Sequence, residues 1–221
     1  MSRRLSRRLG ALVMALLGAS AQAESVRLDD FAIPGPSGLS VTLGHMPGVG
    51  WHGAAGQFAG VLDGASFLTY CVELPQHADF GVLYTNYSPV DGVSAFGAAK
   101  ADDLARLVSH LGMSPRWSTE SALVQAAIWE VVHEPGRVYS FTGGEVRTQG
   151  LDAQTQDWLD GFDWSAALRA APEVRIGALG SPSHQDFLTV TPVPEPGTYA
   201  LLGVGLGLVA LAARRQRKAA S

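Results

Sequence analysis

Phe67-Leu68-Thr69-Tyr70-Cys71-Val72-Glu73-Leu74 contains the only cysteine of the 221-residue chain. Its aromatic and β-branched residues, bounded by Asp63-Gly64 before and Pro75 after, predict a β-strand. Asp63-Gly64 is a favourable hairpin turn, so this strand is expected to be the second arm of a hairpin whose first arm covers residues 57–62. A lone cysteine in an exported protein must be buried and inert, paired with another chain, or reactive.

The segments around this hairpin also favour β-structure. Residues 40–43 and 80–87 are strand candidates, and the glycine-punctuated stretch 45–56 is expected to be a turn. The hydrophobic period then changes to that of helices. Leu104, Leu107, Val108 and Leu111 fall at i, i+3, i+4 and i+7, which predicts a helix over residues 98–111.

A second helix is expected from Ser118, with Ser118 or Thr119 as N-cap, to His133 before Pro135-Gly136. A third is expected over residues 152–170, where Gly161 is a possible break, followed by a closing strand at 185–190. The order predicts an α+β fold: a β-rich N-terminal half with strands and a hairpin, packed with two to three helices.

The N-terminus has the pattern of a cleaved secretory signal peptide. Four arginines lie in the first eight residues, a short apolar run covers 9–17, and Ala21-Gln22-Ala23 is an Ala-x-Ala cleavage site. The apolar run is too short for a membrane span, which needs roughly 20 residues. We therefore expect residues 1–23 to be removed and the rest to be exported.

The C-terminus combines three features: Pro194-Glu195-Pro196, an apolar run from 199 to 213, and a basic cluster at 214–218. Prolines delimit the apolar helix, and the basic cluster should stay cytoplasmic by the positive-inside rule. This tail resembles the PEP-CTERM sorting signal of Gram-negative bacteria. The resemblance implies a transient inner-membrane helix, processing by an exosortase, and delivery to the cell surface or to an exopolysaccharide and biofilm matrix. A plain membrane anchor is the alternative.

These signals divide the chain into a signal peptide (1–23), an extracellular domain (24–190) and a sorting signal (191–221). The chain has 16 basic and 20 acidic residues. Four of the basic residues lie in the signal peptide and four in the terminal cluster, so residues 24–213 hold 8 basic and 20 acidic residues, a net charge of −12. This balance argues against nucleic acid as a partner.

Two short stretches together resemble the thioester domains of bacterial surface adhesins: Tyr70-Cys71-Val72-Glu73 and residues 124–129 (VQAAIW). In that family a Tyr-Cys pair on a strand is followed by a helix with a Thr-Gln-x-Ala-Ile/Val-Trp motif. The resemblance implies an internal thioester between Cys71 and Gln125, shielded by Tyr70 and Trp129, which captures a partner's amine covalently. Val124 replaces the family's threonine, which does not take part in the bond.

Glu73 and His133 are further candidates, for proton transfer near that bond. Each residue also has a plain interpretation: a lone cysteine is commonly a small buried hydrophobe, and a helical glutamine is commonly solvated. The competing hypothesis is a non-covalent structural matrix protein whose cysteine is buried or forms a dimer. The histidines show no zinc spacing, and no phosphate loop, dinucleotide fingerprint or hydrolase motif is present. We therefore expect no metal, no cofactor and no enzymatic turnover.

Overall fold

The computed structural model describes residues 24–193, 201–202, 204–206 and 209. Its strands and helices confirm the α+β class. In chain order they are β1 (Glu24–Phe31), β2 (Gly38–Leu43), β3 (Gly50–Ala54), β4 (Phe58–Leu62), β5 (Ala65–Thr69), β6 (Leu83–Asp91), α1 (Gly92–Phe96), α2 (Ala98–Leu111), α3 (Ser118–His133), β7 (Val146–Gly150), α4 (Ala153–Asp160), α5 (Trp164–Arg169), β8 (Val174–Gly180) and β9 (Phe187–Pro192).

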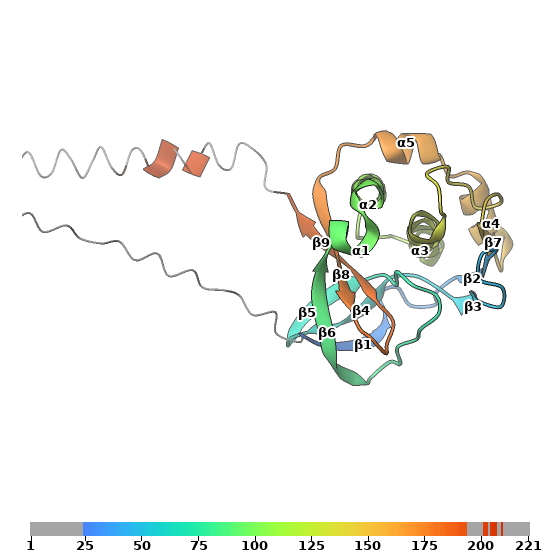
Figure 1. The fold of residues 1–221 in the computed structure, drawn as a ribbon, viewed down its shortest axis with the longest axis horizontal. Helices are drawn as coiled ribbons and strands as arrows, with labels where there is room; N and C mark the ends of the chain where they lie inside the picture. Colours follow the sequence, from blue (N-terminus) through green and yellow to red (C-terminus); the bar gives the residue numbers. More distant parts are fainter. Residues whose placement is uncertain (1–23, 194–200, 203, 207–208, 210–221) are drawn as a thin grey trace, which may run out of the picture.

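The larger of two sheets has the order β5-β4-β1-β6-β8-β9, and each neighbouring pair is antiparallel. The sheet curls until its two edge strands meet (Figure 1). The chain just beyond β5 joins them, because Cys71 forms an antiparallel bridge with Phe187. The Leu188 N–H also donates to the Tyr70 carbonyl at 2.9 Å. The Tyr70–Cys71 segment is therefore the seam that nearly closes this sheet.

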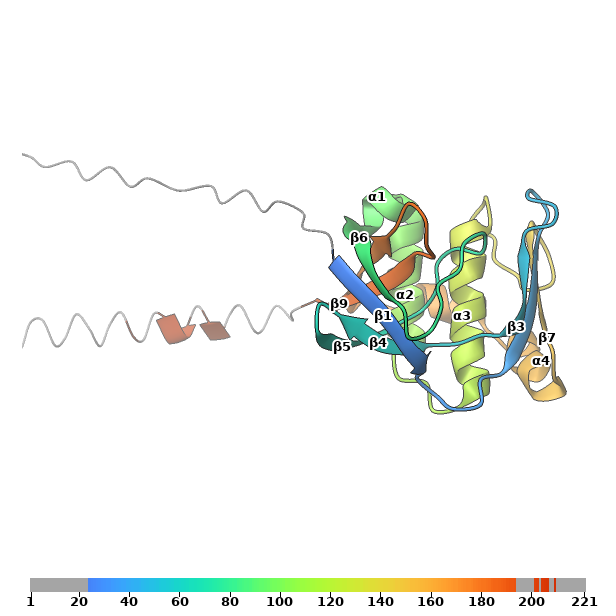
Figure 2. The ribbon, with the colours of Figure 1, turned by 90° about the horizontal axis from the view of Figure 1, so that it is seen from below.

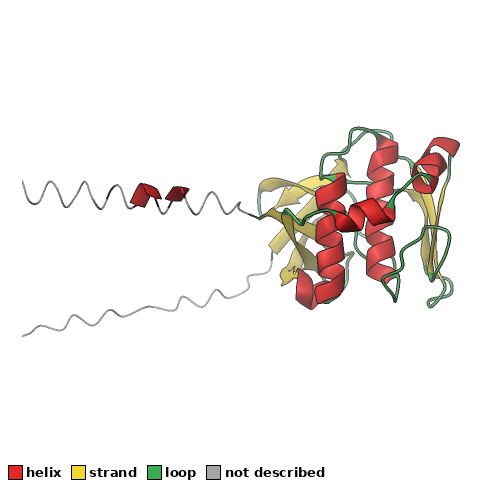
Figure 3. Ribbon diagram, turned by 90° about the horizontal axis from the view of Figure 1, so that it is seen from above, coloured by secondary structure: helices red, strands yellow, loops and turns green. Residues whose placement is uncertain are grey.

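Helix α3 lies between the curled sheet and the smaller sheet, whose order is β3-β2-β7 (Figure 2). From the opposite side α2 runs beside α3, and α5 lies across them (Figure 3). Because α3 is covered on all sides, twelve of its sixteen residues are buried. A helix in this position is apolar around most of its surface rather than along one stripe.

The predicted bounds of α2 and α3 agree with the structure. The predicted N-cap of α3 was wrong, because Trp117 occupies that position and makes no side-chain cap. Glu120 instead accepts a hydrogen bond from the Arg116 N–H at 2.6 Å, which ties the preceding turn to the helix. The third helical stretch is divided into α4 and α5 with Gly161 as the C-cap of α4, as its sequence suggested.

The hairpin of β4 and β5 was predicted correctly, and its turn has the backbone that the sequence requires. Asp63 and Gly64 have φ values of 48° and 84°, the left-handed conformation of a two-residue hairpin turn. The strand itself was predicted too long. It ends at Thr69, and Cys71 lies beyond it in the isolated bridge to Phe187.

The stretch 45–56 was predicted as turn but contains strand β3, and β7, β8 and the short helix α1 were not predicted. The glycines of β3 interrupt the alternating pattern that predicts a strand, yet one of them, Gly50, is required by the fold. A Cβ on Gly50 would lie 2.2 Å from the Val41 carbonyl oxygen of the paired strand. The second half of the domain therefore contains β7 and β8 in addition to β9, the predicted closing strand.

The expected signal peptide and Pro194-Glu195-Pro196 lie outside the described residues, as does most of the apolar run 199–213. Among the residues that are described, no helix is long and apolar enough to cross a membrane.

Candidate functional site

The structure brings Cys71 and Gln125 together, 54 residues apart in sequence. The Cys71 N–H donates to Gln125 Oε1 at 3.0 Å, and Gln125 Nε2 donates to the Cys71 carbonyl at 2.8 Å. Both residues are buried, with exposed fractions of 3% and 1%. The Gln125 carboxamide is thus fixed against the buried cysteine backbone, and it is not a solvated helix side chain.

This contact depends on the seam between β5 and β9. The Val72 N–H donates to the Asp186 carbonyl at 3.1 Å, and the Thr69 hydroxyl donates to the Leu188 carbonyl at 2.8 Å. These bonds hold the chain on both sides of Cys71 to β9. Gln125 supplies the partners that the Cys71 backbone lacks on its other side, where α3 packs against the seam.

The environment of Cys71 keeps its thiol protonated. Burial raises its pKa well above the ordinary value, the negative charge of Glu73 raises it further, and a hydrogen bond with Gln185 acts in the opposite direction. A neutral buried thiol reacts poorly with reagents from outside. Any chemistry at this sulfur therefore involves a group already held beside it.

The other candidates surround this pair in different ways. Tyr70 is fully buried, and Trp129 lies one helical turn after Gln125 with its indole N–H unpaired among the described residues. Glu73 Oε1 accepts a hydrogen bond from the Asp186 N–H at 3.1 Å, so its carboxylate supports the start of β9. Burial lowers the pKa of His133 to about 4 and so keeps its ring neutral, while a hydrogen bond with the Val72 backbone acts in the opposite direction.

A cavity of about 460 Å³ leads from the surface to Cys71 and Gln125. Aromatic side chains and a few polar groups line it, together with small residues. The aromatic residues are Phe31, Trp51, Phe58, Phe80 and Trp129, and the polar ones are His77, Asp79 and Gln185. Phe31, Phe58 and Phe80 pack on one another with ring centroids 4.9–5.6 Å apart.

Sequence reasoning missed most of this cavity. Phe80 reaches it because Leu28 and Phe80 form a parallel bridge and the Gly81 N–H donates to the Leu28 carbonyl at 2.7 Å. His77 and Asp79 lie on the segment between β5 and β6, where no hydrophobic period indicates their direction. The one available signal was the spacing of Gln125 and Trp129, which places both side chains on the same face of a helix.

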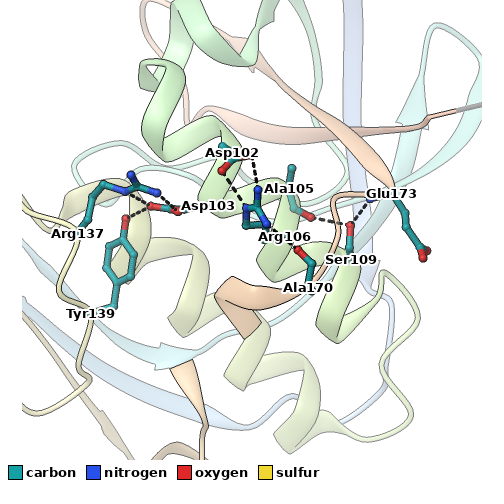
Figure 4. A network of polar contacts seen from close by, with 9 residues as sticks. All are labelled: Asp102, Asp103, Ala105, Arg106, Ser109, Arg137, Tyr139, Ala170 and Glu173. Atoms are coloured by element: carbon teal, nitrogen blue, oxygen red, sulfur yellow. Dashed lines mark hydrogen bonds and ion pairs between the residues drawn. The ribbon is translucent and has the colours of Figure 1, made fainter. Parts of the chain in front are cut away.

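A second polar network lies away from the cavity and connects α2 with the segment after α3 (Figure 4). Asp103 on α2 is only 2% exposed. Arg137 binds both of its oxygens, at 2.5 and 2.7 Å, and the Tyr139 hydroxyl donates to it at 2.7 Å. Burial alone would raise the pKa of Asp103, but hydrogen bonds from Arg137 and Tyr139 and the positive charge of Arg137 lower it. These contacts join α2 to the segment after α3.

The described residues contain no group of three or more His, Cys, Asp or Glu side chains that could hold a metal ion. Comparison with known protein families finds one match, in which residues 192–218 fit the PEP-CTERM protein-sorting motif. This supports the expectation of an exported protein sorted through its C-terminal tail by an exosortase. No curated protein and no solved structure matches the chain.

Proposed function

We propose that the chain is a surface or extracellular-matrix protein of a Gram-negative bacterium whose domain forms a Cys71–Gln125 thioester and captures a partner's amine covalently. The exosortase would process the tail after a transient stay in the inner membrane. One observation carries the chemical part of the proposal: the Gln125 carboxamide makes two hydrogen bonds to the Cys71 backbone inside the protein. The protein is then a single-use adhesin rather than an enzyme with turnover.

These two hydrogen bonds suit the condensation. When the Cys71 sulfur attacks the Gln125 carboxamide carbon, negative charge develops on Oε1, which already accepts the Cys71 N–H. The carbon–nitrogen bond then breaks, the thiol proton passes to the departing nitrogen, and ammonia leaves. The product is a buried thioester. A partner's amine that enters the cavity forms an amide with the same carbon and releases the Cys71 thiol.

The intact mass of the secreted protein tests this proposal. We expect the mature protein to weigh less than its sequence by one ammonia, and methylamine to add its full mass at Gln125 and expose one thiol. Cys71→Ala is the required control, because without the sulfur no thioester can form. This variant should keep its fold, regain the missing mass and form no adduct. A native protein with full mass and no adduct would refute the proposal.

A structural role is the second candidate, and one observation favours it. The two hydrogen bonds of Gln125 satisfy the Cys71 N–H and carbonyl without any covalent bond, as buried polar groups require. In this case the thiol titrates fully after denaturation. A disulfide with a second chain, the other form of this hypothesis, would require the seam to open, because Cys71 is only 3% exposed.

A further inference from the structure

We propose that His77 takes the proton from the amine that attacks the Cys71–Gln125 bond and that Asp79 holds the incoming ammonium group beside it. This inference rests on the proposed thioester and adds the residues that select and activate its nucleophile. It starts from the cavity, the route by which the structure connects the buried pair to solvent.

The titratable side chains in the cavity wall are Cys71, His77 and Asp79. Cys71 is consumed in the bond, so His77 and Asp79 are left to handle a proton or a charge there. Both are exposed, which gives an incoming molecule direct access to them. Glu73 and His133, the acid and base expected from the sequence, are absent from the wall of this cavity.

The segment that carries His77 and Asp79 is anchored on both sides. The Gln185 side chain donates to the Glu73 carbonyl at 3.0 Å, and the Gln185 N–H donates to the His77 carbonyl at 3.4 Å. The Asp79 N–H donates to the Tyr84 hydroxyl at 2.9 Å. The His77 ring also packs near the Trp51 ring, with centroids 5.9 Å apart. The imidazole is therefore held at the wall of the cavity.

An alkylamine is protonated at neutral pH and must lose a proton before it can attack. Aromatic walls and a carboxylate attract the ammonium form, and histidine is the side chain suited to accept a proton near neutrality. His77 takes one proton from the ammonium, and the amine nitrogen then attacks the Gln125 carbonyl carbon. The carbon–sulfur bond breaks, the second proton passes from nitrogen to the Cys71 sulfur, and His77 returns its proton to solvent.

Two small nucleophiles test this inference on the secreted protein. Methylamine is an ammonium ion at neutral pH, whereas methoxyamine is largely unprotonated and needs no base. We expect His77→Gln to slow adduct formation with methylamine roughly a hundredfold and to leave methoxyamine unchanged, with added imidazole restoring part of the rate. Asp79→Asn should likewise slow methylamine alone. The matched control is His52→Gln, because His52 is also an exposed histidine, next to Trp51, but does not line the cavity.

Each variant must first show the loss of one ammonia, which proves that its thioester has formed. Equal slowing of both nucleophiles, or no slowing of either, would overturn the roles of His77 and Asp79 while the thioester stands. A native protein that loses no ammonia and reacts with neither nucleophile would instead refute the proposed function. The two failures are therefore distinguishable.

Discussion

At the scale of single residues, the acid Glu130 in α3 has the least usual environment. It is fully buried, Oε1 accepts a hydrogen bond from the Ser140 N–H at 2.7 Å, and Oε2 has no partner among the described residues. Burial raises its pKa to about 8, against the hydrogen bond from Ser140 and assisted by the charge of Glu134. The folded protein thus binds a proton that the unfolded chain releases at lower pH.

This raised pKa makes the domain less stable as the pH rises. Between the ordinary pKa of a glutamate and about 8, the unfolded state holds fewer protons, so the free energy of unfolding falls with pH. The fall in the free energy of unfolding that Glu130 causes is on the order of 3 kcal/mol. We expect Glu130→Gln, which keeps the acceptor for Ser140, to abolish it. Urea unfolding of both proteins from pH 5 to 9 measures it, and parallel profiles would contradict the prediction.

At the scale of elements, the network around Asp103 determines how the segment after α3 is attached. Arg137 and Tyr139 follow α3, whereas Asp103 belongs to α2, so their hydrogen bonds hold the two parts together (Figure 4). Residues 140–146 are tied to α3 as well, because Glu134 Oε2 accepts from the N–H groups of Glu145 and Val146. Helix α3 is therefore fixed on the side away from Cys71.

Removal of one hydroxyl tests this attachment. Tyr139→Phe deletes a hydrogen bond to a buried carboxylate and should lower the free energy of unfolding by about 2 kcal/mol. The urea midpoint should fall with an unchanged slope, since the surface exposed on unfolding stays the same. Tyr84→Phe, which removes the hydroxyl that accepts the exposed N–H of Asp79, is the comparison and should cost less. An equal loss in both variants would contradict a special role for Asp103.

The elements also show what the sequence could predict. The local sequence is sufficient to predict α2, α3 and the Asp63-Gly64 turn, because helix periodicity and a two-residue hairpin turn depend only on nearby residues. It failed for β3, where Gly50 is required by the close approach of Val41, a residue on another strand. It also failed to end β5 at Thr69, because the bridge that follows is made with Phe187, far along the chain.

The same limit applies to the candidate site. The Cys71 and Gln125 pairing followed from two motifs and is present as a pair of hydrogen bonds, while the covalent bond stays a prediction. His77 and Asp79 had no motif. They reach the cavity because the segment between β5 and β6 is anchored to the turn before β9 and to Tyr84. Such contacts depend on the tertiary fold and leave no local pattern.

At the scale of the whole molecule, the scarcity of lysine bears on which amines a thioester would meet. The sequence has two lysines, Lys100 and Lys218, and Lys218 lies in the sorting tail. Lys100 Nζ donates to the Val132 carbonyl at 2.7 Å, and burial lowers its pKa, against the charge of Glu134. The domain itself therefore presents hardly any side-chain amine, although its 8 basic and 19 acidic residues (24–190) give it a net charge of −11 that attracts basic partners.

We therefore expect the protein not to cross-link to copies of itself. Concentrated native protein, incubated and then denatured without reducing agent, should run as a monomer, while the same sample should add Nα-acetyl-lysine at Gln125. The engaged Lys100 explains the first result, and an accessible cavity explains the second. Peptide mapping of any higher band decides the matter: a Lys100–Gln125 linkage between two chains would show that the Val132 contact does not protect this amine.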